Sequence, residues 1–329
     1  MRAVLLSLCV LARLAAQSPL ADAVENGDND EVRRLLESSA VNSSQADGTT
    51  ALHWATYHDD LALAQELLAA GANAKARNHF GSTPLALACE NGNAALAGLL
   101  LKAGADPNLV AGGQPILAIA ARTGKVGPVE ALVRAGAVVD ESDNRGQTAL
   151  MWAAAEGHAE VVKFLLGEGA DPAAKLKSGF NAWFFAARNG RSEVVEALLD
   201  LGVVNEVMNP AKSGGRNPRT GMSALMLAVE NGHFELGVKL LEAGADPNDQ
   251  RSGFTPLHAL TWVRKPDGGD DPKGDPSPVG SGSVGSLQFV RILVDHGADV
   301  NARLKTDPSW HRRRKLSMKG ATPFFLACK

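Results

Sequence analysis

The stretch TALMWAAAEGHAEVVKFLLGEGAD, residues 148–171, decides the fold because related copies of it recur along almost the whole chain. It contains a short apolar helix pattern, a Gly-His turn, a second helix pattern with apolar residues three and four apart, and a closing glycine. A pair of such short helices has apolar residues on both sides and can bury them only against another copy. The stretch therefore predicts a stack of helix pairs without a single large core.

Aligning the chain on this unit places repeat starts at Ser18, Thr50, Thr83, Pro115, Thr148, Asn181, Ser223, Thr255 and Thr322. Most intervals are 32 or 33 residues, and Thr or Ser at a start is suited to cap the helix that follows. The motifs TALH at 50–53, TPLA at 83–86 and TPLH at 255–258, at this period, resemble the ankyrin repeat. The resemblance implies an all-α ankyrin repeat solenoid with β-hairpin fingers over residues 18–329, with eight helix pairs and an incomplete ninth.

Three inserts interrupt the period, at residues 205–220, 262–286 and 303–319. The first and third lengthen fingers, whereas the second is rich in Gly, Pro, Ser and Asp and separates the two helices of one pair. Some exported bacterial multi-ankyrin-repeat proteins look similar, with an interrupted repeat near the same place in the array.

The first 17 residues lie outside the period and read as an arginine, a short apolar run and small residues near Ala16. This pattern is typical of a signal peptide, and the apolar run is too short to span a bilayer. We therefore expect an exported protein, periplasmic or secreted; if residues 1–17 form a capping helix instead, a cytoplasmic protein is expected.

The last residues also depart from the pattern, because the chain stops at Lys329 inside a first helix, just after Phe324 and Phe325. A terminal repeat normally presents a polar outer face. We therefore expect a monomeric array that is continued or capped beyond Lys329.

Candidate catalytic residues coincide with repeat positions. His53 and His258 occupy the TPLH position, whose histidine by the resemblance makes a structural hydrogen bond between fingers. His53 and His58 are five residues apart, about 140° around a helix, so they cannot share a metal ion. The aspartates of residues 267–275 lack the spacing and the final glutamate of a calcium loop. We expect no enzyme, no cofactor and no metal, and the net charge of −3 gives no reason to expect nucleic acid.

Binding positions follow from the resemblance, which implies that finger tips and the ends of first helices line a concave groove. On this chain these positions give Tyr57, Phe80, Arg122, Arg145, Phe180, Arg188, Arg219, Met222, Arg251, Phe254 and Trp262. Arginine and aromatic residues are typical of interface hot spots, whereas Trp54 and Trp152 are expected in the core. We therefore expect a non-enzymatic protein–protein interaction module that holds an acidic or amphipathic segment of a partner between Thr148 and Trp262.

An alternative is attachment to an anionic surface, a membrane or a polyanion, through the basic loop 303–319. Its candidate contacts are Trp310, Arg312, Arg313, Arg314 and Lys315. A solvated loop is the ordinary explanation of such a charge run.

Overall fold

The computed structural model describes residues 18–37, 40–210, 220–263, 282–306 and 318–327. The chain divides into two compact units, Met1–Ala149 with Phe164–Ala170, and Leu150–Lys163 with Asp171–Lys329. The division falls within one helix pair, α10 (Ala149–Glu156) and α11 (Ala159–Gly167). Each unit is described by itself below.

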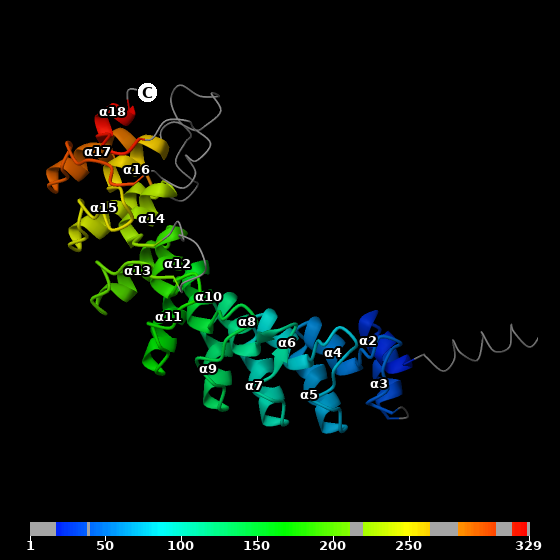
Figure 1. Ribbon diagram of the computed structural model, residues 1–329. Helices are drawn as coiled ribbons and strands as arrows, with labels where there is room; N and C mark the ends of the chain where they lie inside the picture. Colours follow the sequence, from blue (N-terminus) through cyan, green and yellow to red (C-terminus); the bar gives the residue numbers. More distant parts are fainter. Residues whose placement is uncertain (1–17, 38–39, 211–219, 264–281, 307–317, 328–329) are drawn as a thin grey trace, which may run out of the picture. The chain divides into compact units, whose positions relative to one another are not determined.

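The first unit contains four complete helix pairs and one two-stranded finger. The pairs are α2 (Pro19–Glu25) with α3 (Asn29–Leu36), α4 (Ala51–Tyr57) with α5 (Leu61–Ala69), α6 (Pro84–Glu90) with α7 (Ala94–Lys102), and α8 (Ile116–Arg122) with α9 (Val126–Arg134). Strands β1 (Val110–Ala111) and β2 (Gln114–Pro115) pair antiparallel in the finger before α8. Helices α2, α4, α6 and α8 pack side by side in one layer, and α5, α7 and α9 pack in the other (Figure 1).

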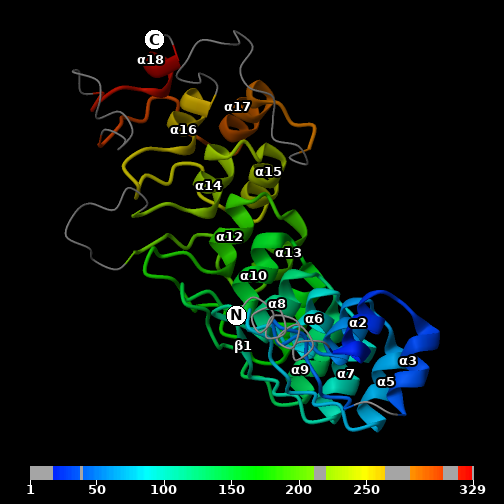
Figure 2. The same ribbon diagram turned by 90° about the vertical axis from the view of Figure 1, so that its right-hand side faces the viewer.

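The second unit repeats this arrangement. Its helices after α11 are α12 (Ala182–Arg188), α13 (Ser192–Leu199), α14 (Ala224–Glu230), α15 (Phe234–Glu242), α16 (Pro256–Val263), α17 (Ser286–Asp295) and α18 (Pro323–Ala327). Figure 2 shows α12, α14 and α16 in one layer and α13, α15 and α17 in the other. Within the described residues the chain thus has eight helix pairs followed by α18, and the expected stack is confirmed.

Local signals explain where the first helices begin. Each first helix starts one residue after an aligned repeat start, from Pro19 in α2 to Pro323 in α18. Thr83 shows why: its side chain accepts a hydrogen bond from Ala86 N, and Pro84 fills the first helical position, where a missing N–H costs nothing. The following apolar side chains are buried against the neighbouring pairs, so that each helix is stabilised mainly by stacking.

The fingers also stack on one another by backbone hydrogen bonds. His79 N donates to Asp47 O at 2.7 Å, and Asn144 N donates to Gly113 O at 3.3 Å. In the second unit Lys305 N donates to Gly253 O at 2.9 Å. Neighbouring fingers are therefore held in a fixed register within each unit, which positions the residues at their tips.

Four asparagines tie successive repeats together at the opposite end of the finger. Asn108 is typical: its side-chain amide donates to Gly136 O at 3.1 Å, and its side-chain oxygen accepts from Val138 N at 2.8 Å. The glycine closes the second helix of the next repeat, so that one side chain satisfies both a free carbonyl and a free N–H of the following loop. The same pair of bonds is made by Asn42, Asn205 and Asn248.

Candidate functional site

The carboxyl ends of the first helices form a row of exposed side chains along the first unit. Glu25, Tyr57, Glu90 and Arg122 are the last residues of α2, α4, α6 and α8, and all four are exposed. They occupy the same place in four successive repeats, and their helices pack side by side. We call these four residues the helix-end row. Tyr57 is the large aromatic member of the row and exposes 57% of its surface.

An aromatic cluster surrounds Tyr57. The Tyr57 ring lies edge-on to Trp54, with centroids 5.6 Å apart, and His58 stacks on Trp54 at 5.9 Å. Trp54 is half-buried rather than in the core as expected, because its indole N–H reaches out to Gln45 Oε1 of the adjoining finger at 2.9 Å. Trp152, the second tryptophan expected in the core, is likewise half-buried.

The finger tips supply a second exposed row in the first unit. Phe80 lies at the tip before α6 and exposes 79% of its surface, and Arg145 is exposed at the tip before α10. Asp47, at the tip before α4, is half-buried, and its carboxylate accepts hydrogen bonds from Thr49. Asn78 Oδ1 accepts a hydrogen bond from Phe80 N at 3.1 Å, which fixes the turn that presents the ring. The helix-end row and the finger tips together present aromatic and charged side chains.

The prediction of partner contact is wrong for three residues. Phe180, Met222 and Phe254 are buried, with 2%, 2% and 3% of their surface exposed. All three directly precede a repeat start, where the finger returns to the stack. Phe180 O and Met222 O accept backbone bonds from the outgoing arm of the same finger, both at 2.8 Å, and the side chains turn inward. A partner cannot contact a side chain without accessible surface.

Two predicted arginines in the second unit have structural partners. Arg251 donates to both carboxylate oxygens of Asp249, at 2.8 and 3.0 Å, and to Asn205 O at 3.0 Å. The hydrogen bonds that the Arg251 guanidinium donates to Asp249 raise its pKa, and together with the bond to Asn205 O they hold the finger together. Arg188 is exposed, and its guanidinium lies 5.6 Å from the centre of the Phe180 ring. Arg219 and the side chain of Trp262 lie outside the described residues.

Most of the exposed candidates are in the first unit, namely Tyr57, Phe80, Arg122 and Arg145. In the second unit Arg188 and Arg251 are exposed, and Arg251 is paired with Asp249. The sequence predicts a binding segment that begins at Thr148. Most of the candidate side chains in that segment are buried or paired within the chain, so they are not available to a partner.

Histidines that resemble catalytic groups have structural roles. Thr50 N donates to His53 Nδ1 at 3.2 Å, so Nε2 carries the proton and donates to Ser82 O at 3.2 Å in the next finger. His258 makes the same bonds to Thr255 and Ala321. Burial lowers the pKa of both imidazoles below the ordinary value of 6.5 and so favours their neutral form.

The one cysteine in the described part of the chain has no features of a nucleophile. Cys89 is buried, and burial raises the pKa of its thiol to about 12. The described residues also contain no group of three side chains that could hold a metal ion. Among them there is no helix long and apolar enough to cross a bilayer.

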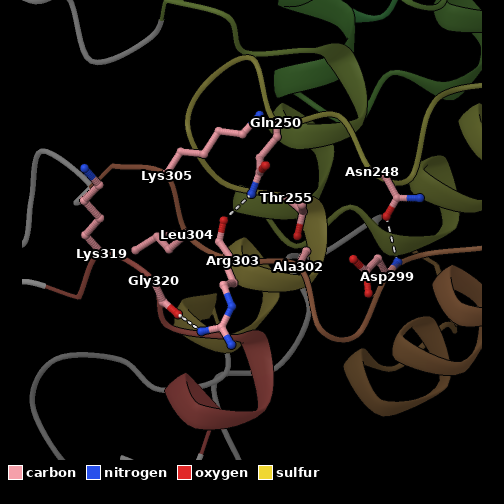
Figure 3. A pocket seen from close by; sticks show the side chains of 10 residues that line it. All are labelled: Asn248, Gln250, Thr255, Asp299, Ala302, Arg303, Leu304, Lys305, Lys319 and Gly320. Carbon is pink, nitrogen blue, oxygen red and sulfur yellow. Dashed lines mark hydrogen bonds between the residues drawn. The ribbon is translucent and has the colours of Figure 1, made fainter.

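A cleft of about 840 Å³ opens in the second unit beside the finger that leads to α18. Arg303, Lys305 and Lys319 line it, but the Arg303 guanidinium donates to Gly320 O at 3.1 Å. Figure 3 shows Lys319 pointing away from Arg303, so the cations do not converge on one anion. The alternative surface contacts Trp310, Arg312, Arg313, Arg314 and Lys315 lie outside the described residues and stay a prediction.

Comparison with known proteins agrees with this architecture. A family model described as "Ankyrin repeats (3 copies)" matches residues 20–111, 110–176 and 183–265, more than half of the chain. The crystal structure of the human ASB11 ankyrin repeat domain is similar with a TM-score of 0.59 at 28% identity, over 70% of this chain and all of that one.

Two curated proteins match shorter stretches. The mouse nuclear factor NF-kappa-B p105 subunit is 38% identical over 101 residues, which is 30% of this chain and 10% of that protein. The human NF-kappa-B inhibitor alpha is 36% identical over 101 residues, 29% of this chain and 32% of that protein. The matched stretch thus covers about a tenth of the first relative's length and about a third of the second's. Likeness to exported bacterial multi-ankyrin proteins, and a signal peptide at residues 1–17, which lie outside the described residues, stay predictions.

Proposed function

Because the chain belongs to the ankyrin repeat family, we propose that it is a non-enzymatic module that binds another protein through its first unit. Ankyrin repeats are generally protein–protein interaction modules. In this chain the proposed docking face consists of the helix-end row and the finger tips Asp47, Phe80 and Arg145. This face is earlier in the chain than the segment that the sequence favoured.

The observation that carries the proposal is the exposure of two large aromatic side chains on this face, Tyr57 and Phe80. Aromatic residues are enriched at the centres of protein interfaces, because they bury much surface with little loss of side-chain entropy. The core side chains of the same repeats are buried. The exposed residues can therefore differ from repeat to repeat while the buried core that supports them stays alike. The structural roles of His53, His258 and Cys89 further support a non-enzymatic protein.

The test compares capture of partner proteins by the full chain and by two double variants. Tyr57→Ser with Phe80→Ser removes the exposed aromatics of the docking face. Val138→Ser with Leu287→Ser removes exposed apolar side chains elsewhere and is the control. We expect the first variant to lose the captured partner, with affinity reduced about tenfold to a hundredfold, or about 1.4–2.8 kcal/mol. Equal retention of the partner by both variants, each folded by circular dichroism, would contradict the proposed face.

A further inference from the structure

The first unit carries a net negative charge, whereas the second does not. Residues 18–149 and 164–170 carry 17 Asp and Glu against 9 Lys and Arg, whereas residues 150–163 and 171–329 carry 19 against 22. The first three repeats, residues 18–114, account for 12 of the acidic residues and only 5 of the basic ones. A unit with this excess attracts cationic partners and repels acidic ones.

The helix-end row places carboxylates on both sides of the exposed aromatic ring. Glu25 and Glu90 are the neighbours of Tyr57 in the row, one repeat before it and one after it. Neither glutamate forms an ion pair with another described residue. Each is the last residue of its helix, where the carbonyl groups add partial negative charge. A cation from a partner would therefore be stabilised at either glutamate.

The aromatic cluster and the carboxylates belong to one hydrogen-bonded network. Gln45 accepts from the Trp54 indole N–H, and its own amide donates to Asp22 Oδ1 at 2.8 Å and to Glu25 Oε2 at 2.5 Å. The network holds the Trp54 ring close to two carboxylates. A lysine or arginine side chain placed over the Trp54 and Tyr57 rings would gain cation–π attraction together with the carboxylate charge.

A cavity beside the row has room for a side chain. Its volume is about 210 Å³, and Glu25, His58 and Asp60 are among the residues that line it, between the first two helix pairs. Small-molecule sites usually measure about 300–1,000 Å³. The cavity is therefore better suited to one side chain of a bound segment than to a free ligand.

From these observations we infer that the first unit binds a basic segment of the partner protein, with lysine or arginine side chains at Glu25 and Glu90 and over Tyr57. This rests on the proposed function. Helix layers roughly 8–10 Å apart place Glu25 and Glu90 roughly 16–20 Å apart. At about 3.3 Å per residue an extended segment of about six residues spans that distance. Arg122, next in the row, repels a further cation and limits the basic segment to the first three repeats.

Fluorescence anisotropy of the full chain with two labelled peptides tests the inference. The probes are an arginine–alanine repeat octapeptide and a glutamate–alanine repeat octapeptide. We expect the basic peptide to bind and the acidic one not to bind, with affinity that falls as salt is raised. Glu25→Gln with Glu90→Gln should weaken the basic peptide by about tenfold, or about 1.4 kcal/mol.

The matched control is Glu66→Gln with Glu168→Gln, which removes the same charge from exposed residues of the first unit that lie outside the helix-end row. We expect it to weaken the basic peptide by less than about threefold, because charges beyond about 10 Å are largely screened. The inference is overturned if the basic peptide does not bind, binds no more tightly than the acidic one, or is weakened equally by both double variants. If it fails while partner capture still depends on Tyr57 and Phe80, the proposed function stands without it.

Discussion

Replacement of His53 by alanine is expected to lower the free energy of unfolding by about 3 kcal/mol. The imidazole is 1% exposed and bonds to Thr50 within its own repeat and to Ser82 O in the next finger. Alanine leaves a cavity and removes the hydrogen-bond partners of buried groups, both of which destabilise the fold. Urea denaturation of the two proteins, followed by circular dichroism, measures the difference.

The pH dependence gives a second readout of the same change. Burial lowers the pKa of His53 below 6.5, so below that pH the unfolded chain binds more protons than the folded one. The free energy of unfolding of the parent protein should therefore decline as pH falls below 6.5, and less steeply without His53. His79→Ala, at an exposed finger position, is the control and should cost less than about 0.5 kcal/mol. Equal losses for His53→Ala and His79→Ala would refute the structural role of His53.

Replacement of Gly221 by alanine should have a comparably large effect, a loss of about 3 kcal/mol or more. The glycine has φ of +80°, and a Cβ atom there would lie 2.4 Å from the backbone carbonyl of Arg251 in the next finger. The two fingers must separate to admit the methyl group, because backbone atoms cannot rotate away as a flexible side chain does. Thermal and urea unfolding of the variant measures the loss.

Gly244→Ala separates the strain of the backbone from the close approach. Gly244 has φ of +93°, but no atom lies within 4 Å of a Cβ built on it. Its replacement should cost only the left-handed conformation, about 1–2 kcal/mol. If the two alanine variants are equally stable, the close stacking of the fingers does not contribute to stability.

The stack of helix pairs could be predicted from the sequence because each signal repeats. The period near 33 residues, the Thr or Ser at the starts and the glycines at the turns all indicate the same helix pairs. The resemblance to the ankyrin repeat predicts that the histidine of the TPLH motif makes a structural hydrogen bond between fingers, and the bond from His53 Nε2 to Ser82 O confirms it.

The exposure of several site residues could not be predicted. They lie in the fingers, which are irregular, and the helical period does not indicate which way a finger side chain points. Phe180, Met222 and Phe254 turn inward at the point where the finger rejoins the stack. Arg251 pairs with Asp249 two residues earlier, and this spacing was the available signal that it is not free. The asparagine bonds between repeats also had a signal, the recurrent Gly-Ala-Asp-Pro-Asn at 104–108 and 244–248.

The helix-end row was visible in the sequence only in part. The place in the repeat indicates Tyr57, Glu90 and Arg122, whereas Glu25 has the composition of ordinary surface. The structure adds that Glu25 shares a network with Trp54 and that a cavity opens beside it. This information depends on contacts between repeats, and a single sequence does not contain them.

Hydrogen–deuterium exchange of the full chain, with and without its captured partner, tests the proposed docking face most directly. Binding to this face should slow exchange in residues 54–58 and 78–91, which contain Tyr57, Phe80 and Glu90, and leave α5 and α7 of the opposite layer unchanged. Protection confined to α5 and α7, or to the second unit, would contradict the proposal that the partner binds through the first unit's helix-end row and finger tips.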